Sequence, residues 1–315
     1  MNKSRIEIID YMKAIAIIFV IFDHIGIVST NNFFYCFFIR MAVPIFMTLS
    51  GYTFCVANER KESLKELYEL KKIFKNIVRF IFPALLSCIF VMIWEPNNKS
   101  LFKTFIMGGY GPGSYYPILM VQFVFVCPLL YRYVKDRKSI LVTIFLCIFF
   151  EILTNVLHMN PGVYRILLYR YIIYIVGGMI IYRMKDDISI RVKFSIFICG
   201  VLYIIMIKEG YKPVIFKSWS NTAMPVAMYV VPIVYTIIRK YYFFSIKNIV
   251  GNILGTIGKA SYHILFAQII MRKLWEQIGN DSFVSVVSIC LFSSLILGVM
   301  LWKIEDKFIF KKFIK

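Results

Sequence analysis

Ten long apolar stretches follow one another along this chain, separated by short polar connections. A helix needs about 20 mostly apolar residues to cross a bilayer. We therefore predict membrane-spanning helices near residues 9–29, 33–57, 77–94, 116–134, 139–157, 166–183, 193–208, 222–239, 260–276 and 282–303. The stretches are spread evenly, so we expect one membrane domain over residues 1–315. The predicted fold class is an all-α polytopic membrane protein.

The composition supports a membrane environment and argues against nucleic acid as a partner. The chain is 60% hydrophobic and 17% charged, whereas soluble domains are about 25% charged. Its net charge of +20 first suggests nucleic-acid binding. A nucleic-acid binder, however, carries its basic residues on a solvated face. Here they lie in short gaps between apolar stretches, so the lipid bilayer is the expected partner.

The distribution of Lys and Arg predicts the orientation in the membrane. If the N-terminus is cytoplasmic, the segments on the inner side hold 26 of the 37 Lys and Arg residues and those on the outer side hold 9. Basic residues accumulate in cytoplasmic loops. The bias therefore predicts ten spans with both termini cytoplasmic, in a multi-pass plasma-membrane protein.

Two connections have distinctive sequences. Residues 58–76 are charged but carry leucines at helical spacing, which predicts an amphipathic helix along the cytoplasmic membrane surface. An ordinary helical linker anchored by lysines is the alternative. The outer segment 108–116, GGYGPGSYY, must bend sharply because Gly permits positive φ and Pro112 fixes its own φ.

The cysteines give no sign of a disulfide framework or a metal site. All seven fall inside apolar stretches, none forms a CxxC motif, and no histidine lies at metal-ligand spacing. We interpret them as small buried hydrophobic residues. No metal cofactor is expected.

Ionisable groups inside a span are costly in hydrocarbon and normally face a cavity, and the first span carries several of them. Lys13 and His24 are eleven residues apart, and eleven steps of about 100° return to within about 20° of the start. The two therefore share a helix face and lie about 16 Å apart along the axis. Asp10 is a neighbour of Lys13 on that face, whereas Asp23 lies about 100° round the helix.

This arrangement suits a donor that has a phosphorylated head and a long flexible arm, as coenzyme A has. Lys13 near the cytoplasmic mouth would hold phosphates, and the imidazole of His24 would act as a general base. The alternatives are a histidine hydrogen-bonded between helices and a lysine that snorkels to the membrane edge.

Several blocks of the sequence resemble the acyltransferase-3 family of bacterial membrane acyltransferases. The first span, IIDYMKAIAIIFVIFDHIG, has the family's basic residue and histidine at the same spacing. RMAVPIFMTLSGYTF and KNIVRFIFP resemble the family's next two segments, and GSYYPILMVQ, YIVGGMIIY and GKASYHILFAQ resemble later ones. The resemblance runs in order from about residue 6 to about residue 270. It departs from the family at Lys13, where Arg is common, and at Tyr115 or Tyr116, where Trp is often found.

The resemblance implies transfer of an acyl group, with acetyl-CoA as the expected cytoplasmic donor, to a hydroxyl of a surface glycan or lipid-linked saccharide. His24 would be the general base, and Arg40 would stabilise negative charge or form an ion pair with Glu151. The chain ends soon after the tenth span, so we expect no extracytoplasmic hydrolase-like domain. Assembly into a homo-oligomer is left open.

The remaining site residues have weaker support. Lys75 and Arg79 would help Lys13 to bind the nucleotide phosphates, although both also fit the cytoplasmic excess of basic residues. Ser50 would carry an acyl group or, as an alternative, let two helices approach closely. The residues expected to bind substrate are Asp10, Ser50, Tyr115, Tyr116 and Glu151.

The chain has two further histidines, and two other classes of function compete with an acyltransferase. His263, expected near the inner end of the ninth span and away from His24, suits helix packing, and His158 in an outer loop carries no signal. A transporter or polysaccharide exporter could also use charges inside the membrane, although the two halves show no repeat of the hydropathy pattern. A non-catalytic accessory subunit is the other competing class.

Overall fold

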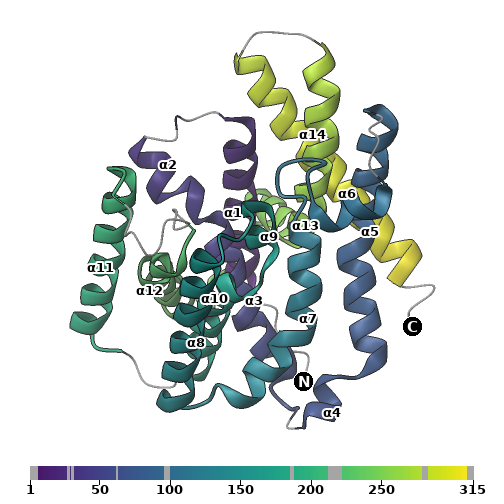
Figure 1. Cartoon of the computed structure of the whole chain (residues 1–315). Coiled ribbons are helices and arrows are strands. Elements are labelled where there is room, and N and C mark those ends of the chain that lie inside the picture. Colours follow the sequence, from purple (N-terminus) through teal and green to yellow (C-terminus); the bar gives the residue numbers. More distant parts are fainter. Residues whose placement is uncertain are drawn as a thin grey trace. The chain divides into compact units, whose positions relative to one another are not determined.

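The structure of the protein is a computed structural model that describes residues 6–26, 29, 32–61, 63–95, 100–184, 188–211, 222–278 and 283–310. Within these ranges the chain is helical and contains no β-strand. The longer helices are α1 (Glu7–Ile25), α3 (Ala42–Asn58), α5 (Leu70–Trp94), α7 (Tyr116–Tyr133), α8 (Arg137–Val156), α10 (Tyr169–Arg183), α11 (Ile190–Lys208), α12 (Ala227–Lys240), α13 (Ile249–Ile278) and α14 (Phe283–Ile304) (Figure 1).

These helices correspond to the ten predicted spans. Eight helical stretches among the described residues are long and apolar enough to cross a membrane. The other two predicted spans are α1, which has 19 residues but several ionisable side chains, and α12, which has 14 residues. The chain is therefore an all-α polytopic membrane protein. Its orientation stays a prediction, and most of the outer segment 208–221 lies outside the described residues.

The structure adds short helices where the sequence predicted continuous spans or loops. The second predicted span comprises α2 (Phe33–Phe37), a 3₁₀ helix η1 (Ile39–Met41) and α3. Two further short helices, α6 (Leu101–Met107) and α9 (Pro161–Ile166), lie in predicted outer connections. The chain also forms a 3₁₀ helix, η3 (Met224–Val226), ahead of α12 and a π-helix, η4 (Glu305–Phe310), after α14.

Residues 58–76, predicted as one amphipathic helix, are divided between elements. The short helix α4 (Leu64–Leu67) begins at Ser63, and α5 then starts at Leu70 and continues into the third predicted span. The side chain of Ser63 accepts a hydrogen bond from the backbone N–H of Glu66, and the Glu66 carboxylate accepts one from the backbone N–H of Ser63. This capping box starts a new helix at Ser63.

The ninth predicted span, residues 260–276, is longer in the structure. α13 has 30 residues and begins at Ile249. Gly258, one of the glycines that interrupt the apolar pattern, lies in a close contact with another helix. A Cβ atom added at Gly258 would lie 2.0 Å from the backbone carbonyl oxygen of Asp10 in α1. Small residues let helix backbones approach in this way. The extension places His263 near the middle of α13 rather than near its inner end.

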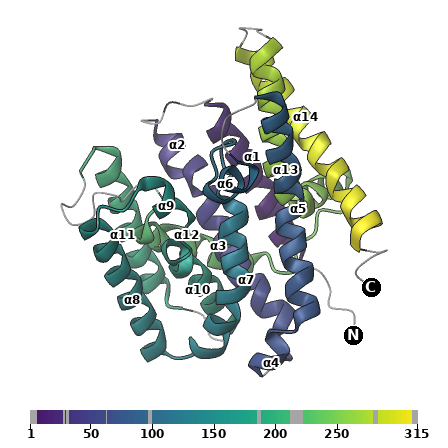
Figure 2. The same cartoon turned by 45° about the vertical axis from the view of Figure 1, so that its right-hand side comes forward.

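The chain divides into two compact units, which are described separately. Unit 1 comprises residues 1–29, 74–121 and 243–315, and unit 2 comprises residues 30–73 and 122–242. In unit 1, α13 packs against both α1 and α14 (Figure 2). In unit 2, α10 packs against α3, α8 and α12, and α11 packs against α12.

Glycines also set the packing of unit 2. A Cβ atom at Gly51 of α3 would lie 2.0 Å from the carbonyl oxygen of Ile175, and one at Gly178 of α10 would lie 1.9 Å from the carbonyl oxygen of Thr48. Each helix thus presents a glycine to the backbone of the other. The alternative role predicted for Ser50 is to let two helices approach closely. Such a close approach is present at the neighbouring Gly51.

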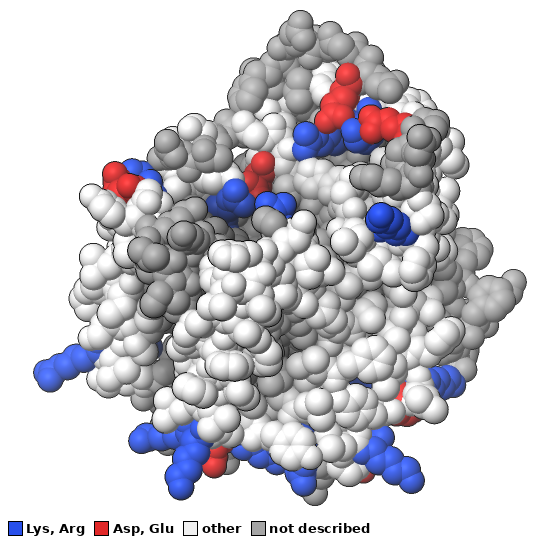
Figure 3. Space-filling view, viewed as in Figure 1, with Lys and Arg blue, Asp and Glu red and all other residues white. Residues whose placement is uncertain are grey.

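Large apolar side chains cover much of the outer surface, as expected for helices that face lipid. Phe145 and Phe149 of α8 and Phe194 and Leu202 of α11 are all exposed, and most of the face drawn in Figure 3 is uncharged. Among the described residues, the seven cysteines form no disulfide bond. Six are buried as predicted, and Cys199 of α11 is exposed.

Candidate active site

His24 lies in the last turn of α1, which is a single unbroken helix from Glu7 to Ile25. The helix ends because Gly26 adopts a left-handed conformation with φ 75°, and its N–H donates to the carbonyl of Phe22. His24 and Lys13 are both half-buried, and Asp10 is buried. Because α1 is continuous, the helical phase that puts Lys13 and His24 on one face applies to the folded protein.

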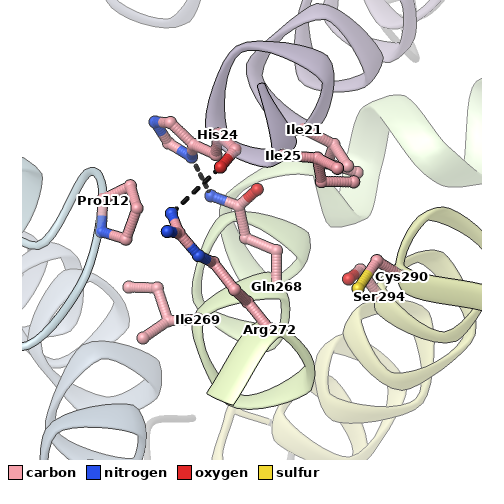
Figure 4. A pocket seen from close by; sticks show the side chains of 9 residues that line it. All are labelled: Ile21, His24, Ile25, Pro112, Gln268, Ile269, Arg272, Cys290 and Ser294. Atoms are coloured by element: carbon pink, nitrogen blue, oxygen red, sulfur yellow. Dashed lines mark hydrogen bonds between the residues drawn. The ribbon is translucent and has the colours of Figure 1, made fainter. Parts of the chain in front are cut away.

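Two side chains of α13 hold His24. The side-chain amide nitrogen of Gln268 lies within hydrogen-bonding distance of His24 Nδ1 (Figure 4). One turn further along α13, Nη1 of Arg272 donates to the backbone carbonyl oxygen of His24 at 2.9 Å. The last four carbonyls of a helix have no partner within the helix, so Arg272 caps the end of α1. Together the two residues fix both the ring and the backbone of His24.

The glycine-rich loop 108–116 covers the other side of the imidazole. Gly113 has φ +81°, and a Cβ atom there would lie 3.4 Å from Cε1 of His24 and 3.0 Å from Leu265. A Cβ at Gly111 would lie 2.5 Å from the side chain of Ile269. The predicted sharp bend is therefore present, and its glycines let the loop backbone lie directly against α13 and His24.

A small pocket borders His24 and has room for about one water-sized group. It is lined by Ile21, His24 and Ile25 of α1, Pro112 of the loop, Gln268, Ile269 and Arg272 of α13, and Cys290 and Ser294 of α14 (Figure 4). All nine residues belong to unit 1. The pocket therefore combines an imidazole, an amide and a guanidinium with mainly apolar walls, an arrangement that can move a proton and stabilise developing negative charge.

The comparisons with known proteins decide the family. A family model described as an acyltransferase domain, Acyl_transf_3, matches residues 6–303, which is nearly the whole chain. The chain belongs to the acyltransferase-3 family. Comparison with curated proteins and with solved structures gives no match. The predicted resemblance is thus confirmed, and the protein is a membrane acyltransferase.

Four other residues predicted for the phosphate and acceptor sites of this acyltransferase lie in unit 1. Lys75 and Arg79 are on α5, where Lys75 is half-buried and Arg79 is exposed. Tyr115 is half-buried just before α7, and Tyr116 is buried at its first residue. Their roles in binding stay predictions.

Three predicted site residues of the acyltransferase belong to unit 2. The guanidinium of Arg40 lies 5.0 Å from the ring centre of Tyr35. The hydroxyl of Ser50 donates to the carbonyl of Phe46 at 2.8 Å within α3. Glu151 is fully buried in α8 and accepts a hydrogen bond from the Tyr164 hydroxyl at 2.8 Å. The catalytic role of Arg40 and the acyl-carrier role of Ser50 stay predictions.

The sequence analysis did not single out Gln268 or Arg272. Both lie in or just after the block GKASYHILFAQ, and their four-residue spacing puts them on one face of a helix. That spacing was the available signal, but many helix faces carry two polar residues. Among the described residues, no group of three or more His, Cys, Asp and Glu side chains could hold a metal ion.

Proposed function

We propose that this acyltransferase moves an acyl group from cytoplasmic acyl-CoA to a hydroxyl of a cell-surface glycan or lipid-linked saccharide, with His24 as the general base. One observation carries the proposal. In a chain of the acyltransferase-3 family, a half-buried imidazole at the end of α1 borders a pocket and has its Nδ1 against an amide. A general base needs to be held in position beside its substrate in this way.

The reaction that fits these groups is direct transfer. His24 takes the proton from the acceptor hydroxyl as its oxygen attacks the thioester carbonyl carbon. The C–O bond forms, the C–S bond breaks, and the imidazolium returns the proton to the departing CoA thiolate. Arg272 lines the same pocket and donates to the backbone carbonyl of His24, so it is a candidate to stabilise the oxyanion.

Basic residues of unit 1 support a phosphorylated donor. Lys13 precedes His24 by eleven residues on the same helix, about 16 Å along its axis. Lys75 and Arg79 follow on α5 within the same unit. The pocket itself is too small for more than the reacting end of a substrate. We therefore assign the phosphates of acyl-CoA to Lys13, Lys75 and Arg79, and the thioester end to His24.

The test is release of CoA by the purified full-length protein from acetyl-CoA, with and without a saccharide acceptor. We expect turnover in the wild type and a loss of about 100-fold or more in His24→Ala, since general-base catalysis contributes about 10²–10⁴-fold. His158→Asn is the matched control, because His158 is exposed and has a positive φ of 47° that Asn tolerates. Equal turnover in wild type and His24→Ala would contradict the role of His24.

The acceptor is tested separately in the producing bacterium. Mass analysis of surface glycans with and without the gene should reveal a difference of one acyl group, whose mass identifies the group transferred. A transporter or exporter would instead change the amount of glycan at the surface while leaving the acylation of the remaining polymer unchanged. That outcome would replace the proposed function.

A further inference from the structure

The contact between Gln268 and His24 has a consequence for the protonation of the ring. A neutral imidazole has one nitrogen that donates and one that accepts, and the partner of one nitrogen fixes the state of the other. The partner here is an amide, which offers a donor at one end and an acceptor at the other. Its orientation toward Nδ1 therefore determines which nitrogen of His24 carries the proton.

The two orientations have opposite effects on a base. With the amide nitrogen toward Nδ1, as drawn in Figure 4, Gln268 donates to Nδ1 and the ring proton lies on Nε2. A half-turn of the amide presents its oxygen, which accepts from Nδ1–H. Nε2 then carries the lone pair of the ring and can take a proton from a hydroxyl. Only the second orientation makes Nε2 a base.

The surroundings limit the movement of the ring and of the amide. Gln268 is 5% exposed, so bulk water does not compete for its amide. Arg272 holds the backbone of His24. A Cβ atom at Gly113 would lie 3.4 Å from Cε1, the ring carbon between the two nitrogens. The close approach of α13 to α1 at Gly258 keeps the two helices at a fixed separation. The contact between Gln268 and Nδ1 is therefore held by the packing around it.

We infer that Gln268 is a positioning residue that sets the tautomer of His24, and that its amide oxygen accepts Nδ1–H in the reactive state. This inference rests on the proposed function, because it gives His24 the role of base. Gln268 does not touch the substrate in this scheme. It acts through the imidazole by directing the lone pair of Nε2 toward the acceptor hydroxyl.

The tautomer can be observed directly because the chain has only three histidines. Labelling the full-length protein with ¹⁵N-histidine gives three pairs of ring resonances, one pair for each histidine. The pair that is missing from the spectrum of His24→Gln belongs to His24. We expect one dominant tautomer in the wild type, a mixture of both in Gln268→Leu, and the Nδ1–H tautomer in Gln268→Glu, whose carboxylate can only accept. An unchanged His24 spectrum in Gln268→Leu would overturn the inference.

Turnover provides the second readout. In Gln268→Leu, kcat should fall by about 100-fold, the effect of misorienting a catalytic group, with KM for acetyl-CoA nearly unchanged. Gln268→Glu, which keeps the acceptor, should restore most of kcat. A fall in kcat without a change of tautomer would indicate packing alone and would also overturn the inference.

The control is Gln122→Leu. Gln122 is a half-buried amide of unit 2 that bonds the backbone at Ile166 and Leu168, so its loss should affect stability and leave the His24 spectrum unchanged. The same experiments separate this inference from the proposed function. If His24→Ala retains turnover, the proposed function fails. If His24→Ala is inactive while Gln268→Leu keeps the wild-type spectrum and kcat, only the inference about Gln268 fails.

Discussion

Gly258 of α13 lies directly against the backbone carbonyl of Asp10 in α1. The hydrogen atom of glycine fits there, whereas a Cβ atom would approach the Asp10 oxygen to 2.0 Å. The contact sets the separation of the two helices that carry Gln268 and His24. Because the obstructing atoms are backbone, a side chain cannot turn aside to relieve the clash.

We expect Gly258→Ala to lower both stability and turnover, with a loss of about 1–3 kcal/mol or more from overpacking. Gly255→Ala is the matched control on the same helix, since its nearest neighbour is an atom of Tyr11 at 4.0 Å. There alanine should be neutral or stabilise by up to about 1 kcal/mol through helix propensity. Thermal unfolding and CoA release measure the two effects. Similar results for both variants would contradict the packing role of Gly258.

The loop that covers His24 gives a second matched pair. Gly113 and Gly109 both have positive φ, so alanine is strained at either position. A Cβ at Gly113 would meet His24 and Leu265, whereas one at Gly109 has nothing within 4 Å. We expect Gly113→Ala to lower kcat by about 10- to 100-fold, because a displaced catalytic group reacts slowly. Gly109→Ala should show a similar loss of stability with a much smaller loss of kcat, which side-by-side melting and turnover assays would reveal.

A third prediction concerns the buried pair of His263 and Glu305, which joins α13 to η4. His263 Nε2 lies within hydrogen-bonding distance of Glu305 Oε2, and both side chains are almost fully buried. Their other polar atoms, His263 Nδ1 and Glu305 Oε1, have no hydrogen-bond partner among the described residues. Removing one member of a buried pair leaves the other uncompensated.

Glu305→Ala should therefore destabilise the protein by about 3–5 kcal/mol. The double variant His263→Leu/Glu305→Leu should be destabilised by less than the sum of the two single leucine variants, since an apolar pair leaves no buried charge. A double-mutant cycle from unfolding in detergent measures the coupling. Additive single effects would mean that the two residues do not interact.

A fourth prediction is a pH dependence at the start of α8. The side chain of Asp136 accepts hydrogen bonds from Ser139, and these hold the pKa of the carboxyl below its ordinary value of 3.8. A carboxyl with a lowered pKa stabilises the folded state above its unfolded pKa, and this contribution is lost as the pH falls through the folded pKa. Stability should thus decline below about pH 4, where Asp136 becomes protonated.

Asp136→Asn keeps the capping oxygen but cannot ionise, so this variant should lose that part of the pH dependence while retaining most of its stability at neutral pH. Asp136→Ala removes the cap and should be less stable at both pH values. Melting temperatures measured between pH 3 and pH 7 distinguish the three proteins. Parallel curves for wild type and Asp136→Asn would refute the assignment.

The sequence predicted the positions of most long apolar helices, because a bilayer demands them. Among the described residues, eight helical stretches are long and apolar enough to cross a membrane, against ten predicted spans. The prediction placed the start of the ninth span at residue 260 instead of Ile249, because Gly251, Gly255 and Gly258 interrupt the apolar run. Of these, Gly258 is explained by the backbone of a neighbouring helix, where its Cβ would lie 2.0 Å from the carbonyl oxygen of Asp10. The capping box at Ser63, which separates α4 from α3, has a recognisable sequence pattern. The helical spacing of the leucines nevertheless led to the prediction of one continuous helix.

For the site, the sequence determined by itself that Lys13 and His24 share one face of the first span, because helical phase depends only on position within a helix. It also contained the ordered blocks that identify the family over residues 6–303. Only the tertiary structure decided which groups surround the imidazole. Gln268 is 244 residues from His24 along the chain, and no local pattern encodes a contact between side chains of two helices so far apart. That contact follows from how closely Gly258 of α13 lets this helix approach α1.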